Sequence, residues 1–165
     1  QYYTQNCLRG VVNGGPLDNA CPNVKEHGSK SHQIERSSFI TLIRRQLAND
    51  LDANFEPLDL PSSRSVPFKV RLASHGYMLA AKCTAVDFVA FLKHEAAVYQ
   101  QLKPIQGIHV PVHLGNIDLD KPYYYEGIAG LVNVMFLSVG GTVIHRHMHV
   151  DYRAHLTQQG YFSFT

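Results

Sequence analysis

Apolar residues recur at helical spacing in two stretches of the chain. In residues 37–52 they return every three or four positions with polar residues between them, which predicts an amphipathic helix capped by Ser37 or Ser38. Residues 86–102 repeat this pattern and predict a second helix. Lys103 and Pro104 end it, because proline cannot continue a helix. The expected core-facing residues are Phe39, Leu42, Ile43, Leu47 and Leu51 in the first helix, and Phe88, Phe91, Leu92, Val98, Tyr99 and Leu102 in the second.

Shorter apolar runs predict the strands of a sheet. Residues 66–73 and 77–83 flank a short polar turn that ends in Gly76, which is typical of a hairpin. Further strands are expected at residues 108–114 and 131–138, with a short strand between them in which residues 116–119 and 123–125 flank a turn at residues 120–122. This order favours an α+β fold, in which an antiparallel five-stranded sheet with one packed helix follows a loop-rich segment and one amphipathic helix.

The chain divides into three parts by its composition. Residues 1–36 are rich in turn-forming glycine and proline, and we expect a loop-rich N-terminal segment there. Residues 37–141 hold the predicted helices and strands. Residues 142–165 show no clear periodicity and receive no assignment.

Composition excludes several classes of protein. With 165 residues, 45% of them hydrophobic, and a net charge of +2, the chain fits a folded domain with a sizeable core better than a disordered protein. No apolar run reaches the length that crosses a bilayer, and no cluster of lysine and arginine is present. Neither a nucleic acid nor a membrane is therefore expected as a partner.

Two cysteines and two histidines of the N-terminal segment have the right chemistry for a structural zinc site. Cys7, Cys21, His27 and His32 offer two thiolates and two imidazoles, and a segment with few core residues gains most from a bound metal. Residues 8–20 separate the two cysteines, a longer gap than standard zinc fingers have. The alternative is two free cysteines packed in a loop, with histidines at the surface.

Other histidines give weaker signals. His145, His147 and His149 alternate, with His155 beyond them, and would share one face of a strand that could bind a transition metal. A solvated tail explains them as well. His109 and His113 belong to the polar face of the expected strand 108–114, and we expect both to be exposed.

Glu95 is the most informative single residue, because it lies within the apolar stripe of the helix expected at residues 86–102. A buried carboxylate needs a cation, and Lys82 on the preceding strand is the candidate. The alternatives are that Glu95 lies in solvent at the edge of the stripe, or that the pair is structural only.

Residues 66–141 resemble the small lobe of a protein kinase, in particular that of divergent kinase-like proteins of filamentous fungi. In this resemblance Lys82 takes the place of the lysine of the VAIK motif and Glu95 that of its helix glutamate. The stretch that contains Cys7 and Cys21 is similar to one that precedes the kinase-like part of that group. The matching segments are FKVRL (68–72), YMLAAKC (77–83), HEAAVYQQL (94–102), IQGIHVPVHLGNIDL (105–119), PYYY (122–125) and VMFLSVGG (134–141).

The resemblance implies an ATP site, in which Lys82 orients the phosphates, Glu95 holds that lysine and residues 137–140 contact adenine. Residues 53–75 contain no glycine to cradle phosphates, and the catalytic-loop and metal-binding motifs of a large lobe are absent. We therefore expect a truncated kinase-like domain with at most weak ATP binding and no phosphoryl transfer by this chain alone. A nucleotide, a protein partner or the missing large lobe are the partners that this implies.

The competing interpretation comes from a different class of protein. It is a non-enzymatic protein-interaction module that a structural zinc stabilises, with the sheet as its binding surface.

Overall fold

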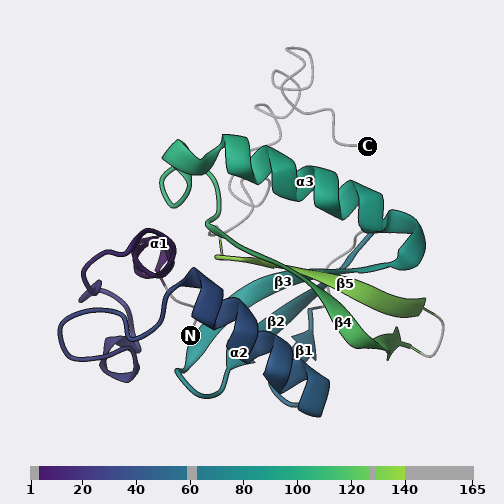
Figure 1. The fold of residues 1–165 in the computed structure, drawn as a ribbon, viewed down its shortest axis with the longest axis horizontal. Coiled ribbons are helices and arrows are strands. Elements are labelled where there is room, and N and C mark those ends of the chain that lie inside the picture. The colour runs from purple at the N-terminus through teal and green to yellow at the C-terminus, as the bar shows by residue number, and fades with distance from the viewer. Residues whose placement is uncertain (1–3, 59–62, 127–128, 140–165) are drawn as a thin grey trace, which may run out of the picture.

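The computed structural model describes residues 4–58, 63–126 and 129–139, and Figure 1 shows the fold. Short 3-10 turns lie between several of the larger elements, at Val24–Glu26, Val86–Phe88 and Lys103–Ile105. The helices and strands are α1 (Gln5–Asn13), α2 (Arg36–Asn49), β1 (Phe55–Pro57), β2 (Val66–Leu72), β3 (Tyr77–Ala85), α3 (Val89–Gln101), β4 (His113–Tyr125) and β5 (Ala129–Leu137).

The five strands form one antiparallel sheet in the order β1-β2-β3-β5-β4. The predicted hairpin is confirmed, since β2 pairs with β3 from Val66 opposite Cys83 to Leu72 opposite Tyr77. The coarse prediction of an α+β fold with a five-stranded antiparallel sheet is therefore confirmed.

Helices cover both faces of the sheet, which differs from the prediction of one packed helix. Because side chains alternate along a strand, Val134 and Phe136 of β5 join the core beneath α1 and α2, whereas Met135 and Leu137 pack against Leu92 of α3. In Figure 1 the sheet accordingly lies between α3 and α2. None of the helices in the described residues has the length and apolar character that crossing a membrane requires.

Helix α1 is a correction to the loop-rich segment expected at residues 1–36. The hydroxyl of Thr4 caps the helix by accepting a hydrogen bond from the backbone N–H of Cys7, and Gly14 ends it in the left-handed conformation, with φ of 70°. Leu8 and Val11 of this helix are buried in the main core. The segment therefore packs on the sheet.

Helix α2 confirms the periodicity, since Phe39, Ile43 and Leu47 are buried. Its N-cap is Glu35, so the predicted cap at Ser37 or Ser38 is wrong.

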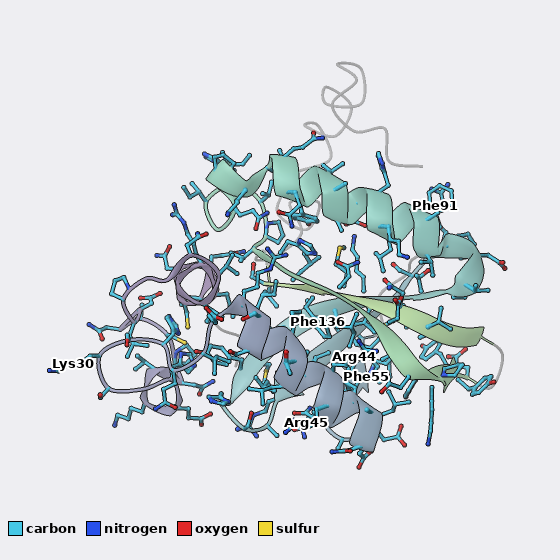
Figure 2. All side chains as sticks on the ribbon, viewed as in Figure 1. Lys30, Arg44, Arg45, Phe55, Phe91 and Phe136 are labelled. Atoms are coloured by element: carbon cyan, nitrogen blue, oxygen red, sulfur yellow. The ribbon has the colours of Figure 1, made fainter. Side chains whose placement is uncertain are left out.

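The predicted apolar stripe of α3 is only partly buried. Leu92 is the one fully buried residue of this helix, whereas the side chain of Phe91 is 54% exposed and that of Val98 is also exposed. Figure 2 shows Phe91 at the outer side of α3 and Phe136 between the sheet and α2. The apolar stripe is wider than the area of contact between α3 and the sheet, because α3 contacts the sheet mainly through Leu92 with Ala96 and Tyr99.

Strand β4 starts later than predicted. Ile108 is exposed within a turn, where Gly107 has φ of 76°, and the strand begins at His113. The exposure expected for His113 is wrong, because its side chain is 3% exposed and stacks on Tyr99. Its backbone N–H donates to the side-chain carbonyl of Gln106 at 2.9 Å. The residues expected to form a turn at 120–122 lie inside β4, at an irregularity in its pairing with β5.

Candidate metal centre

The fold brings Cys7, Cys21 and His27 together. Helix α1 carries Cys7, a turn carries Cys21, and His27 follows the 3-10 turn Val24–Glu26. Their ligand atoms all lie within 4.8 Å of one another, and Cys7 Sγ is 3.1 Å from His27 Nδ1. All three residues are buried, with exposed fractions of 0%, 3% and 0%.

This arrangement fits a metal ion of the zinc type. Tetrahedral zinc has bonds of about 2.3 Å to sulfur and about 2.0 Å to nitrogen, so its ligand atoms are separated by roughly 3.5–3.8 Å. The three donors lie close enough to reach such an ion without a rearrangement of the backbone. Thiolate and imidazole donors also suit zinc better than they suit magnesium or calcium. Cys7, Cys21 and His27 could therefore form a metal site.

The electrostatics of Cys7 and His27 favour neutral side chains when no cation is near. Burial raises the pKa of the Cys7 thiol, and the neighbouring Cys21 and Asp18 raise it further. Burial also lowers the pKa of His27 to about 4, an effect that His32 increases and Glu26 opposes. A neutral imidazole is ready to ligate, whereas the thiols must lose protons, so a divalent cation would supply the compensating charge.

His32, the fourth predicted ligand, lies beside this group and outside it. Its ring centroid is 5.7 Å from that of His27, and its Nδ1 forms a 2.8 Å hydrogen bond with the hydroxyl of Tyr77. Its Nε2 is buried and has no hydrogen-bond partner within the residues that the structure describes. Gly10 makes room for this ring, because a Cβ atom at residue 10 would lie 2.5 Å from His32 Nε2.

Tyr77 connects the centre to the sheet. Its ring stacks on His27 with centroids 4.4 Å apart and meets the edge of Phe39 at 6.4 Å. Tyr77 is the first residue of β3 and is fully buried. The cluster of Cys7, Cys21 and His27 therefore forms part of the main core at the end of the β2–β3 hairpin.

Sequence reasoning missed two residues that join the cysteines, Thr4 and Asp18. The hydroxyl of Thr4 donates to one carboxylate oxygen of Asp18, and the other oxygen accepts from the backbone N–H of Ala20 at 3.0 Å. The backbone carbonyl of Asp18 accepts from the N–H of Cys21 at 2.9 Å. A threonine three residues before Cys7 and an aspartate three before Cys21 are the signals that could have revealed them.

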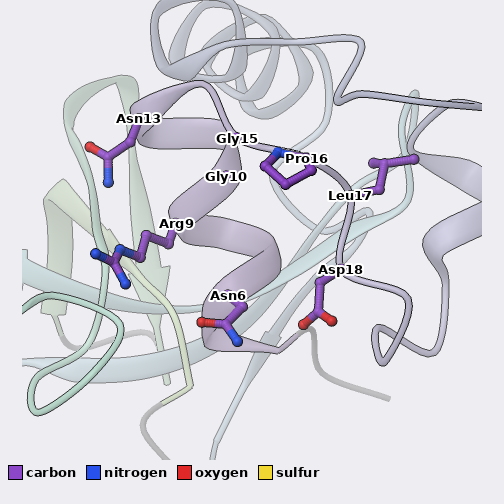
Figure 3. Close-up of a pocket in the computed structure, with 8 residues that line it drawn as sticks. All are labelled: Asn6, Arg9, Gly10, Asn13, Gly15, Pro16, Leu17 and Asp18. Atoms are coloured by element: carbon purple, nitrogen blue, oxygen red, sulfur yellow. The ribbon is translucent and has the colours of Figure 1, made fainter.

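A pocket of about 430 Å³ lies beside the centre, between α1 and residues 15–18 (Figure 3). Its polar lining includes Asn6, Arg9 and Asp18, and the side chains of Arg9 and Asp18 extend toward different sides of it. The residues that line it include neither cysteine nor histidine. The metal-binding chemistry of this region therefore lies in the buried cluster.

The predicted contact between Lys82 and Glu95 is present. Lys82 Nζ lies 2.5 Å from Glu95 Oε1, and their side chains are 39% and 35% exposed, so the pair is half-buried between β3 and α3. A pair in contact with water to this extent contributes about 0–1 kcal/mol to folding. Its role in binding a cofactor stays a prediction.

Some predicted features fall outside the described residues. These are the histidines His145, His147, His149 and His155, the unassigned residues 142–165, and Gly140 of the predicted adenine contact.

Comparison with known proteins finds similarity to the meiotic driver SPOK2 of Podospora anserina. The two sequences are 36% identical over an alignment of 147 residues, and the match covers 86% of this chain and 19% of the relative. The chain therefore spans about a fifth of the length of the relative it matches. No family model matches the chain, and no solved structure matches it.

These findings contradict the predicted kinase-like family. The relative is described as a meiotic driver, and no kinase family model matches, although its fungal source agrees with the fungal part of the prediction. ATP binding at Lys82 and Glu95 likewise has no support. The physical reason lies in residues 53–75, which lack the glycines that let a backbone approach phosphates closely. A lysine–glutamate pair between a strand and a helix is by itself too general to define that family.

Proposed function

We propose that this chain is a non-enzymatic protein-interaction module whose N-terminal part is held in place by a structural zinc ion. The buried cluster of Cys7, Cys21 and His27 is the observation that carries this proposal. Catalytic zinc sites keep one position open to a substrate, whereas structural sites are closed. Three ligands that are almost completely buried support the structural role.

His32 is the fourth ligand in this proposal. The centroid of its imidazole lies 5.7 Å from that of His27, and its Nε2 is buried without a hydrogen-bond partner among the described residues. With His32 the set becomes two thiolates and two imidazoles, which is one of the ligand sets of closed structural zinc sites.

The interaction surface in this proposal is the outer side of α3 with its flanking turns. Several exposed apolar residues belong to this helix and its flanking turns, and exposed apolar patches are typical of surfaces that contact another protein segment. Phe91 and Val98 also line a pocket of about 370 Å³ together with Arg64, whose guanidinium lies 4.7 Å from the Phe91 ring centroid. The exposed residues are Val86, Phe91, Val98, Ile105 and Ile108.

Similarity to a meiotic driver supports a second, wider proposal for a longer protein that contains this chain, namely a role in meiotic drive. A cross that is heterozygous for its gene tests it: transmission to more than half of the offspring is expected, and equal transmission would contradict it.

Metal analysis of the purified protein tests the zinc proposal. One zinc ion per chain is expected in the wild type, with loss of zinc in Cys7→Ser and Cys21→Ser. Chelation should lower the melting temperature, because a ligand at 100 times its dissociation constant stabilises the folded state by about 2.7 kcal/mol. Cys83→Ala is the matched control, since Cys83 is also buried but lies in β3 away from the centre. A wild type that binds no zinc would contradict the proposal.

A further inference from the structure

We propose that the metal centre, through Gln5, sets the backbone geometry where β4 begins and β5 ends. This inference rests on the proposed zinc site and adds a mechanical role to it. Gln5 becomes a positioning residue that transmits the position of α1 to a region distant in the sequence.

Gln5 joins three segments of the chain. Its side-chain N–H donates to the backbone carbonyl of Val139 at 3.0 Å, and its side-chain carbonyl accepts a hydrogen bond from the hydroxyl of Ser138. The same hydroxyl accepts from the backbone N–H of Val112 at 2.7 Å. The backbone N–H of Ser138 donates to the carbonyl of Val112 at 2.9 Å. One glutamine thus satisfies polar groups after β5 and, through Ser138, before β4.

The position of Gln5 depends on the metal ligands. Gln5 is the first residue of α1, and Cys7 follows two residues later. An isolated helix of 9 residues is marginal in water, so its place on the sheet depends on tertiary contacts. Besides the buried Leu8 and Val11 and the partly buried Val12, those contacts include Cys7. A bound ion would tie Cys7 to Cys21 and His27, and thereby hold the start of α1.

Loss of this hold leaves polar groups without partners. Ser138 is buried, and without Gln5 its hydroxyl loses its acceptor while the carbonyl of Val139 loses its donor. A buried polar group that loses its partner destabilises the local structure, which favours local opening. The backbone after β5, at Val139, would then be free to change direction.

The chain offers a matched glutamine at the opposite side of the sheet. Gln46 of α2 donates to the carbonyl of Arg71 and accepts from the backbone N–H of Ala73, both at 2.8 Å. Like Gln5, it donates to one polar group and accepts from another, but it does so at the β2–β3 hairpin instead of at the end of β5.

Residue-resolved amide hydrogen exchange by NMR, on the zinc-loaded and the chelated wild type, tests the inference. On zinc removal the amides of Val112 and Ser138 are expected to exchange about tenfold faster, whereas central β3–β5 amides such as that of Ala81 keep their rates. In zinc-loaded protein Gln5→Ala should give the same local increase, and Gln46→Ala should leave Val112 and Ser138 unchanged. By linkage, Gln5→Ala should also weaken zinc binding about three- to tenfold.

Each other outcome contradicts one identifiable step. If zinc binds but its removal leaves the Val112 and Ser138 rates unchanged, the inference fails and the zinc site stands. A uniform acceleration of all amides, together with a Gln5→Ala variant that exchanges like the wild type, also overturns it. If the protein binds no zinc, the proposed function fails and the inference with it.

Discussion

The two faces of the sheet are built differently. Beneath α1 and α2 lies one large core that includes Phe39, Phe68, Tyr77 and Phe136, with rings in edge and stacked contact. Beneath α3 the buried cluster consists of Leu92, Met135 and Leu137. The first face also carries the candidate metal centre, and the second carries the half-exposed ion pair of Lys82 and Glu95.

The α1–α2 face therefore contributes mainly to stability, whereas the α3 side offers exposed residues for interaction. Residues that hold the fold together gather on the α1–α2 face, because burial of large apolar side chains supplies most of the folding free energy. Helix α3 leaves Phe91 and Val98 in solvent, although it is longer than α1. The short α1, in contrast, has a buried side that Cys7, Leu8 and Val11 form. The length of a helix therefore does not decide how much of it is buried against the sheet.

The largest difference between the two faces is expected when an aromatic ring is removed from each. Phe39→Ala is expected to lower the free energy of unfolding by about 3–5 kcal/mol, since it removes a fully buried side chain. Phe91→Ala should change it by less than about 0.5 kcal/mol, because that ring is exposed. Urea denaturation with saturating zinc measures both. Equal losses in the two variants would show that the faces do not differ in this way.

A glycine beside the metal centre gives the next largest effect. Gly10→Ala is expected to cost about 1–3 kcal/mol in chelated protein, because its Cβ would lie 2.5 Å from His32 Nε2. In protein that already carries His32→Ala, the added Gly10→Ala substitution should therefore cost much less free energy of unfolding. A double-mutant cycle of denaturation free energies reads out the coupling, and a coupling near zero would contradict the contact.

Acid should weaken the α3 face through His113. Burial lowers the pKa of His113, Arg36 lowers it further, and Asn116 and Glu95 oppose the shift. The unfolded chain therefore takes up a proton near pH 6.5 that the folded protein does not, so stability falls as the pH decreases below that value. The slope from one group is at most about 1.4 kcal/mol per pH unit.

His113→Gln should flatten this slope in denaturation experiments at pH 7.5 and pH 5.5. Glutamine keeps a polar group beside Asn116 but does not titrate. An unchanged slope would mean that other groups carry the pH dependence.

The smallest effect is expected at the ion pair. Lys82→Met should change the free energy of unfolding by about 0.2–1 kcal/mol, since both partners are in contact with water. Lys69→Met is the matched control, because Lys69 forms a 2.8 Å pair with the exposed Glu56 on neighbouring strands. A loss above about 2 kcal/mol in Lys82→Met alone would show that this pair is more than a surface contact.

Local patterns predicted the parts of the fold that local forces determine. The periodicity of α2 and the turn that ends in Gly76 were enough for one helix and one hairpin. Helix α1 escaped prediction because its apolar side is narrow and includes a cysteine and a glycine. The burial of His113 could not be predicted either, since it follows from contact with Tyr99 of α3.

The sequence predicted the candidate ligands of the site, but it did not predict the residues that hold those ligands in place. Cys7, Cys21 and His27 were identified by their donor chemistry, and the fold brings them together. The roles of Tyr77, Thr4 and Asp18 depend on tertiary contacts that no spacing shows. The kinase-like assignment failed for a related reason, because it extended one strand–helix ion pair and a series of similar segments to a whole family.

X-ray absorption spectroscopy at the zinc K-edge of the purified protein tests the central claim most directly. The account predicts two sulfur ligands at about 2.3 Å and two nitrogen ligands at about 2.0 Å in the wild type, and no bound zinc in Cys21→Ser. A spectrum with oxygen ligands alone, or a protein without zinc, would contradict it.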